Sequence, residues 1–182
     1  DFNAQRLLPH KFSQYGPALA AGDINGDGLT DVVVGGNSIQ PVFSFIQHSG
    51  NIFAPTLIIK DTTKFQTDNE GVCLFDADND GDLDLYIASG GFEFAKGSQQ
   101  YADHFYLNDG KGNLSADASA IPNILSSKSC VKAADIDNDG DLDLFVGGRV
   151  VPGFYPQPES GYILQNNLKN GKVQFTDVTK TV

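Results

Sequence analysis

Aspartate residues are crowded into three short windows of this sequence. The middle window, DADNDGDLD, holds five aspartates in nine residues. Carboxylates this close together repel one another, so the loop is electrostatically strained unless a cation neutralises it. Counted from its first aspartate, each window has a side-chain oxygen from Asp or Asn at positions one, three, five and nine, and glycine at position six. This pattern favours a metal site.

The donor set points to calcium. Ca²⁺ takes hard oxygen ligands in flexible number, whereas Mg²⁺ needs stricter octahedral geometry and keeps its waters. Alternate side chains at positions one, three and five of a tight loop converge, and glycine at position six permits the sharp turn. Position nine adds a carboxylate, and position seven adds its backbone carbonyl. We predict about three Ca²⁺ ions, held by Asp23, Asn25, Asp27, Leu29 and Asp31, by Asp76, Asp78, Asp80, Asp82 and Asp84, and by Asp135, Asp137, Asp139, Asp141 and Asp143.

Two other interpretations of the windows were weighed. An EF-hand shares the opening of the pattern but needs a bidentate glutamate at position twelve and a helix on each side. Position twelve is Val34, Ile87 or Val146, and the flanking residues favour strands, so an EF-hand is excluded. The windows could also be solvated polar turns without a metal. Three copies in register favour metal binding over that alternative.

The negative charge of the chain is local. Its formal net charge is -11, but thirteen of its 23 acidic residues lie in the three windows, which leaves ten against twelve basic residues elsewhere. A nucleic-acid partner is not expected, because such proteins usually present a basic face. Membrane insertion is not expected either, because no apolar run approaches the length of a span.

The windows recur at intervals of 53 and 59 residues, which indicates a repeat architecture. Each window follows a short apolar stretch and precedes a β-rich run and then a hairpin-like pair with Gly- and Asn-rich turns. We therefore predict an all-β chain of about three four-stranded antiparallel β-propeller blades. The single domain spans 1–182, with blades at roughly 16–60, 71–119 and 129–179 and the outer strand of a preceding blade at 1–15.

Three blades are fewer than the four to eight of ordinary closed propellers. Such a chain forms an open arc or closes by oligomerising, and we expect the arc. The chain also opens and ends at similar points of the repeat, so we expect a fragment of a larger array whose neighbouring blades are its partners.

The windows, with YGPALAAGD before the first and VVVGG or FVGG after the first and third, resemble the FG-GAP or VCBS-type repeat of integrin-α-like β-propellers. Repeats two and three depart from the pattern, with EGVCLF and KSCVKA in place of the Gly-Pro element. The resemblance implies Ca²⁺ bound structurally in the loop between the first two strands of a blade. It also implies a partner on the opposite face and an extracellular, cell-surface or periplasmic location.

Three variable segments, 60–71, 92–104 and 149–161, are predicted on the face opposite the aspartate windows. They carry the loop aromatics Phe92, Phe94, Tyr101, Phe154 and Tyr155. Exposed loop aromatics on a rigid scaffold favour recognition of a ligand. Alternatively, these side chains fold back and cover the gap between blades.

Catalysis is not expected. The three histidines, His10, His48 and His104, have no zinc spacing, and no Gly-x-Ser-x-Gly elbow or Cys/His pair is present. The first functional hypothesis is an adhesion or recognition module for a protein or carbohydrate ligand. The second is a structural scaffold for a domain outside these residues, and a propeller hydrolase or lyase is the weakest. Cys73 and Cys130 are interpreted as small buried hydrophobic residues rather than a disulfide.

Overall fold

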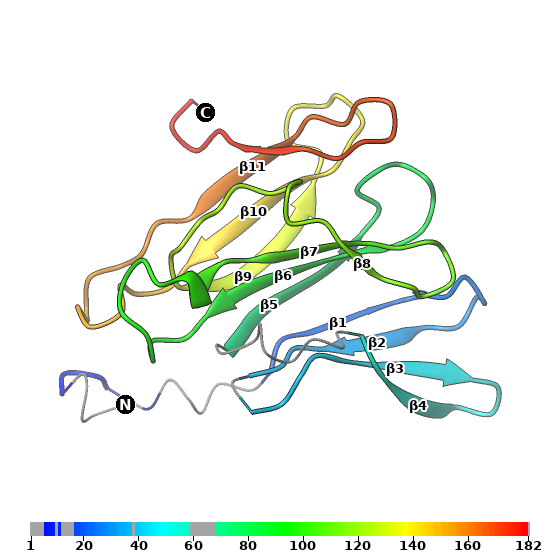
Figure 1. The fold of residues 1–182 in the computed structure, drawn as a ribbon, viewed down its shortest axis with the longest axis horizontal. Helices are drawn as coiled ribbons and strands as arrows, with labels where there is room; N and C mark the ends of the chain where they lie inside the picture. Colours follow the sequence, from blue (N-terminus) through cyan, green and yellow to red (C-terminus); the bar gives the residue numbers. More distant parts are fainter. Residues whose placement is uncertain (1–5, 10, 12–16, 38, 59–67, 182) are drawn as a thin grey trace.

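The computed structural model describes residues 6–9, 11, 17–37, 39–58 and 68–181 (Figure 1). Within these ranges the chain is all-β apart from one 3-10 turn, η2 (Gln99–Tyr101). The strands are β1 (Leu19–Gly22), β2 (Asp31–Val34), β3 (Phe43–His48), β4 (Ile52–Leu57), β5 (Asp68–Phe75), β6 (Asp84–Gly90), β7 (His104–Leu107), β8 (Ser115–Ala116), β9 (Lys128–Ala134), β10 (Asp143–Gly148), β11 (Tyr162–Asn166) and β12 (Phe175–Asp177).

The strands form three antiparallel units of four, which we call blade 1 (β1–β4), blade 2 (β5–β8) and blade 3 (β9–β12). Within each blade every strand pairs with the next strand in the chain. Blades 2 and 3 also share one parallel bridge between Gly90 and Lys128, so together they form a continuous eight-stranded sheet. The prediction of an all-β chain with four strands in each repeat is confirmed.

Turn residues with positive φ close the hairpins between the third and fourth strands. In blade 3, Asn170 and Gly171 have φ of 55° and 71°. Asparagine and glycine enter this left-handed region at little steric cost, and they match the twist of the flanking strands. Positive φ also occurs in the corresponding turns of blades 1 and 2, at Asn51 and Gly110. The turn chemistry of the sequence therefore predicted all three hairpins.

The apolar residues of the sheets are buried between neighbouring blades. Because side chains alternate along a strand, Leu85 and Ile87 of β6 pack in the cluster shared with blade 1. Tyr86 and Ala88, on the other face of β6, pack in the cluster shared with blade 3. Blade 2 is thus covered on both faces, which explains why every residue of β6 is buried.

A buried ion pair lies where β6 meets β9. The Lys128 ammonium is 3.0 Å from Asp103, which also accepts a hydrogen bond of 2.7 Å from the Tyr86 hydroxyl. Lys128 also donates to the backbone carbonyl of Ile124 at 2.7 Å. Burial raises the pKa of Asp103 and lowers the pKa of Lys128. Lys128 also donates to the backbone carbonyl of Tyr101, so three groups surround its ammonium, and sequence reasoning did not predict this network.

Figure 1 shows blades 1, 2 and 3 following one another from the lower to the upper part of the view. The three windows of aspartates form the loops between the first two strands of each blade. The acidic loops of blades 1 and 2 lie at the right of the view and that of blade 3 in its upper part, and the connections between the second and third strands of blades 2 and 3 lie at the left. The expected separation from the acidic loops is therefore observed for the variable segments 92–104 and 149–161.

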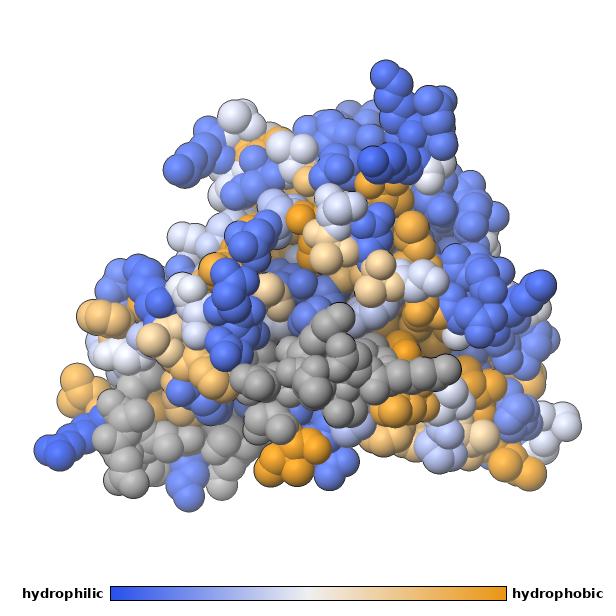
Figure 2. Space-filling view, in the orientation of Figure 1, coloured by the Kyte–Doolittle hydropathy of each residue, from blue (hydrophilic) through white to orange (hydrophobic). Residues whose placement is uncertain are grey.

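Hydrophilic residues cover much of the face seen in Figure 2, and apolar surface is visible toward its lower right, where blade 1 lies. In the described ranges, no helix has the length and apolar character needed to cross a membrane. Both cysteines are free, as expected. Cys73 is half-buried, but the expectation of burial is wrong for Cys130, which is exposed because its side of β9 faces away from blade 2.

Two predicted segments lie largely outside the described residues. Of the proposed outer strand at 1–15, only residues 6–9 and 11 are described, and residues 6–8 include a turn. Leu8 is buried against Phe92 and Val150. Residues 60–67 of the first variable segment, and His10, are outside the described part of the chain. The blade limits themselves stay a prediction.

Candidate metal centres

Each acidic loop is built around the aspartate at position one. The first loop is Asp23–Asp31, the second Asp76–Asp84 and the third Asp135–Asp143. In the second loop, Asp76 accepts the backbone N–H groups of Asp80 at 3.1 Å and Gly81 at 3.0 Å. The equivalent bonds to the glycine at position six measure 2.7 Å in the first loop and 3.2 Å in the third. This aspartate therefore closes the loop.

Glycine at position six has the left-handed backbone that the sequence predicted, with φ of 95° at Gly81 and 96° at Gly140. Position four is left-handed too, with φ of 61° at Asn79 and 63° at Asn138. Sequence reasoning did not single out position four. The signal was present, since glycine or asparagine occupies it in all three loops and these residues tolerate positive φ.

The side chains at positions three and five each accept a hydrogen bond from the backbone N–H two residues further along the chain. Asp78 accepts the N–H of Asp80 at 3.2 Å, and Asp80 accepts the N–H of Asp82 at 3.0 Å. In the first loop Asn25 accepts the N–H of Asp27 at 3.1 Å in the same way. Asparagine and aspartate are thus interchangeable in the framework of the loop, and they differ in charge.

The aspartate at position nine is buried in all three loops and joins two elements. In the second loop, one oxygen of Asp84 accepts the N–H of Ala77 at 2.8 Å, and the other accepts the N–H of Asn108 at 2.9 Å. Asp143 repeats both bonds with Ile136 and Asn166. Position nine therefore ties its loop to the third strand of the same blade, a role that spacing alone did not reveal.

Two of the loops gather carboxylates around a point. One oxygen each of Asp76, Asp78 and Asp84 lies within 4.8 Å of the others, and Asp135, Asp137 and Asp143 are grouped in the same way. These are positions one, three and nine. The aspartates at positions five and seven do not join either group. Among the described acidic, histidine and cysteine residues, the first loop forms no such group, because Asn25 occupies position three.

The metal-free loops carry an unfavourable charge. Burial raises the pKa of Asp84 to about 7. Burial, reinforced by the neighbouring charges of Asp80, Asp78 and Asp76, raises the pKa of Asp82 to about 6. Burial and then the charge of Asp80 raise the pKa of Asp78. A cation would relieve this repulsion.

The aspartate at position seven of the second and third loops also favours a bound cation. One carboxylate oxygen of Asp82 and one of Asp141 are buried without a hydrogen-bond partner in the described part of the chain. The other oxygen of Asp141 accepts the N–H of Leu168 at 3.1 Å. An unpartnered buried acceptor is unfavourable. With the grouped carboxylates, it fits a site for a hard divalent cation.

The acidic loops of neighbouring blades are joined by asparagine side chains. Asn108, at the end of the third strand of blade 2, donates its amide to the Ile24 carbonyl of the first loop at 2.8 Å. Asn166 of blade 3 donates in the same way to the Ala77 carbonyl of the second loop at 2.8 Å. Each asparagine thus connects the position-two carbonyl of one loop to the position-nine aspartate of the next.

The loop aromatics mostly fold back. Phe92 and Tyr101 are buried, and the Tyr101 hydroxyl donates to the Phe94 carbonyl at 2.9 Å. Phe92 packs with Leu8 and Val150, with Tyr155 against them. Of these five aromatics only Phe154 is classed as exposed. The alternative in which these residues cover the gap between blades is favoured for Phe92 and Tyr101.

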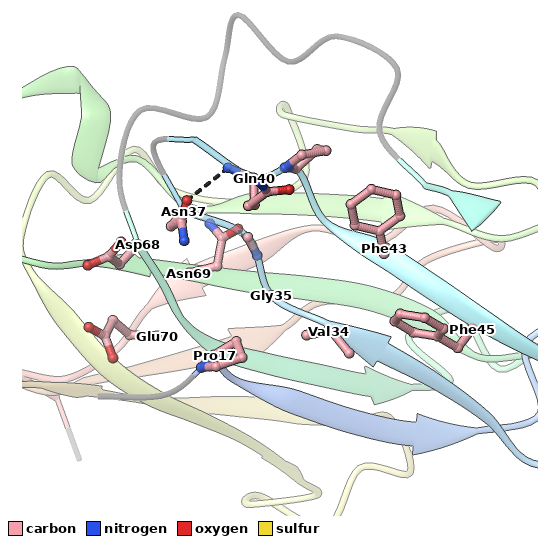
Figure 3. Close-up of a pocket in the computed structure, with 12 residues that line it drawn as sticks. Pro17, Val34, Gly35, Asn37, Gln40, Phe43, Phe45, Asp68, Asn69 and Glu70 are labelled. Carbon is pink, nitrogen blue, oxygen red and sulfur yellow. Dashed lines mark hydrogen bonds between the residues drawn. The ribbon is translucent and has the colours of Figure 1, made fainter. Parts of the chain in front are cut away.

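A pocket of about 340 Å³ lies at the end of the blades opposite the acidic loops (Figure 3). Val34, Phe43 and Phe45 form an apolar wall, and Asp68 and Glu70 at the start of β5 line the far rim, with their carboxylates directed away from the rings. The rest of the lining is Pro17, Gly35, Gly36, Asn37, Gln40, Pro41 and Asn69.

The carboxylates of this pocket are only partly neutralised. Glu70 forms an ion pair of 2.9 Å with Arg149 of blade 3. Burial raises the pKa of Glu70 and opposes the effect of that partner. Burial and the charge of Glu93 raise the pKa of Asp68. The pocket therefore combines an apolar wall with hydrogen-bond acceptors, which is the usual makeup of a small-ligand site.

Comparison with known proteins identifies a repeat family and a similar solved structure. A family model described as FG-GAP-like repeat matches residues 23–87 and again residues 76–146, a span that holds all three acidic loops and more than half of the chain. No curated protein matches the chain.

A solved structure is similar over 90% of this chain, with a TM-score of 0.55 and 20% sequence identity. It is described as the structural basis of specific recognition of non-reducing terminal N-acetylglucosamine by a lectin of Agrocybe aegerita. The similarity covers 38% of that longer chain. At this identity it shows the fold, and it agrees with a partial propeller.

Proposed function

Because the chain belongs to the FG-GAP-like repeat family, we propose that it is a calcium-binding β-propeller segment that acts as an extracellular adhesion or ligand-recognition module. The observation that carries the metal part is the grouping of three carboxylates at positions one, three and nine of two loops. An extracellular, cell-surface or periplasmic location is part of the proposal, since millimolar Ca²⁺ suits weak oxygen sites.

Calcium is the metal that the donor set supports best. All the side chains available are oxygen donors, and Ca²⁺ accepts six to eight oxygens in irregular arrangements. Asp76, Asp78 and Asp84 would hold one ion, and Asp135, Asp137 and Asp143 a second. When bound, Ca²⁺ supplies positive charge and cross-links the two inner strands of a blade. A third ion, at Asp23, Asn25, Asp27 and Asp31, is proposed as the weakest site because it has the fewest carboxylates.

Calorimetric titration of chelator-treated protein tests the metal proposal. We expect saturable Ca²⁺ binding at two sites or more and weaker binding of Mg²⁺. Asp76→Asn and Asp135→Asn should each remove or weaken one site, and Asp117→Asn, outside the loops, should leave both unchanged. Absence of saturable Ca²⁺ binding to a folded sample would refute the proposal.

Recognition is proposed on the opposite side, where the pocket lies. The Asp68 and Glu70 carboxylates at its rim can accept hydroxyl hydrogen bonds, and the Phe43 and Phe45 rings on the other side offer an apolar surface. This chemistry suits a saccharide, and the similarity to an N-acetylglucosamine-binding lectin adds support for that class over a protein ligand. We propose no nucleic-acid partner, no membrane insertion and no catalytic activity.

Glycan-array binding with Ca²⁺ present tests the recognition proposal. Glycan binding that is lost in Asp68→Asn, but kept in Asp117→Asn, would support it. If neither glycans nor candidate protein ligands bind to a Ca²⁺-loaded sample, the second hypothesis is favoured, in which the chain is a structural scaffold for other domains.

A further inference from the structure

The two ends of the blade series expose apolar residues at positions that are buried elsewhere in the molecule. The internal repeat makes this comparison direct, because each residue has an equivalent in the other two blades. The positions are counted from the acidic loops, so they do not depend on a structural superposition.

On blade 3, the side chains of Phe145 and Ile136 are not packed against a neighbouring blade. Phe145 lies two residues after the position-nine aspartate and is 47% exposed, whereas its equivalent in blade 2, Tyr86, is buried. Ile136, at position two of the third loop, is 42% exposed, whereas its equivalent Ala77 is buried. The outer face of blade 3 thus presents the residues that blade 2 buries against its next neighbour.

On blade 1, the complementary position is uncovered. Leu19 lies four residues before the first aspartate of its loop and is 63% exposed, whereas its equivalents Val72 and Val131 are buried. In the contact between blades 1 and 2, Val72 packs in one cluster with Ile24 and Val33. In the contact between blades 2 and 3, Val131 packs in one cluster with Ala77 and Tyr86.

The same chain therefore carries both halves of one recurring contact. Ile136 and Phe145 are equivalent to Ala77 and Tyr86, which form the blade 2 side of the internal contact with blade 3. Leu19 is equivalent to Val131, which forms the blade 3 side of that contact. We propose that blade 3 of one copy of this chain docks on blade 1 of a second copy, and that two copies close head to tail into a ring of six blades.

A polar contact would align the two copies. At both internal contacts, an amide from the end of the third strand donates to the position-two carbonyl of the preceding acidic loop. In the described ranges no side chain occupies the equivalent carbonyl, that of Ile136. Blade 1 offers Gln47 at the donor position, because the N–H of Gln47 donates to Asp31 at 2.8 Å as Asn108 does to Asp84.

The direction of the contact permits ring closure. The two halves differ, so the contact is heterologous, and such contacts form either closed rings or open filaments. Six blades fall within the four to eight of closed propellers. Val34 and Phe45 lie on the same face of blade 1 as Leu19, through the pairs Leu19–Val34 and Val34–Phe43 and the alternation along β3. The docked copy would therefore close the apolar side of the pocket.

Light scattering after size-exclusion chromatography tests the proposal in buffer with Ca²⁺. We expect wild-type protein to have twice the monomer mass of 19.5 kDa. Phe145→Asp and Leu19→Asp should each give monomers, because each change damages both contacts of the ring. Ile52→Asp is the matched control, because Ile52 is 63% exposed, as Leu19 is, and its pairing with His48 places it on the opposite face of blade 1.

Mixing the two variants separates a head-to-tail contact from a symmetric one. A mixture of Phe145→Asp and Leu19→Asp can form one contact with both halves intact, so dimer mass should partly return. Thermal melts check that both variants are folded. A monomeric wild type would overturn the proposal and indicate that the faces serve other blades of a longer chain. A dimer that persists in Phe145→Asp, or a mixture that stays monomeric, would also overturn it.

Discussion

Replacing Asp78 by asparagine should stabilise the metal-free protein and reduce the stability that it gains from Ca²⁺. The first loop already carries asparagine at this position. Asn25 accepts the N–H of Asp27 at 3.1 Å, much as Asp78 accepts the N–H of Asp80 at 3.2 Å. Asp78→Asn therefore keeps the hydrogen bond of the loop and removes only a negative charge.

The size of the effect follows from the spacing of the charges. The grouped oxygens of Asp76, Asp78 and Asp84 lie within 4.8 Å of one another. At such distances two like charges repel by about 1 kcal/mol in water and several-fold more at lower effective dielectric. Asp78 is half-buried, so we take about 1–2 kcal/mol as the relief in the metal-free protein. For a chain of this size, that raises the melting temperature by about 2–8 °C.

With saturating Ca²⁺ this relief is offset by weaker binding of the ion. Loss of one anionic ligand should weaken the second site by about tenfold, which lowers the free energy gained from saturating Ca²⁺ by about 1.4 kcal/mol. Thermal melts in chelator and in excess Ca²⁺ measure both effects. Asp117→Asn removes the same charge outside the loops and should leave the gain from Ca²⁺ unchanged. If the chelated variant melts no higher than wild type and gains as much from Ca²⁺, the carboxylates neither repel one another nor bind the ion.

Four further predictions follow from the same contacts. Chelation should lower the melting temperature by several degrees, because a hundredfold excess of Ca²⁺ over Kd is worth about 2.7 kcal/mol per site; Ca²⁺ should restore it more than Mg²⁺, and a shift within about two degrees would refute the structural role. Asn25→Asp should tighten Ca²⁺ binding at the first loop, and unchanged affinity in calorimetry would show that charge does not limit that site. Asn166→Ala should lower the free energy of unfolding by about 1–3 kcal/mol in urea titration, because the Ala77 carbonyl loses its buried donor; exposed Asn167→Ala should change it by less than about 0.5 kcal/mol, and equal effects would contradict the role of the inter-blade bond. Metal-free protein should become more stable as the pH falls below about 7, because the folded pKa of Asp84 lies above its unfolded value, so the cost of burying the ionised carboxylate is complete only above pH 7 and is lost as Asp84 is protonated. A melting temperature that falls steadily as the pH is lowered from about 7 would contradict this.

The sequence by itself determined the features that depend on neighbours along the chain. The acidic loops close through bonds spanning two to seven residues, such as those from Asp76 to Gly81 and from Asp84 to Ala77. Glycine at position six and the Asn-Gly turn at Asn170 set the local backbone through positive φ. The repeated order of these signals was therefore enough to predict the loops, the hairpins and three four-stranded units.

The tertiary structure decided what depends on how the blades pack against one another. Asn108 and Ile24 are 84 residues apart, and no local pattern indicates that the side chain of one meets the carbonyl of the other. The aromatic residues Phe92 and Tyr101 lie in predicted loop segments, as Phe154 does, yet they are buried and Phe154 is exposed. Burial of an alternating strand face requires a neighbouring sheet, and only the packed blades show which faces have one.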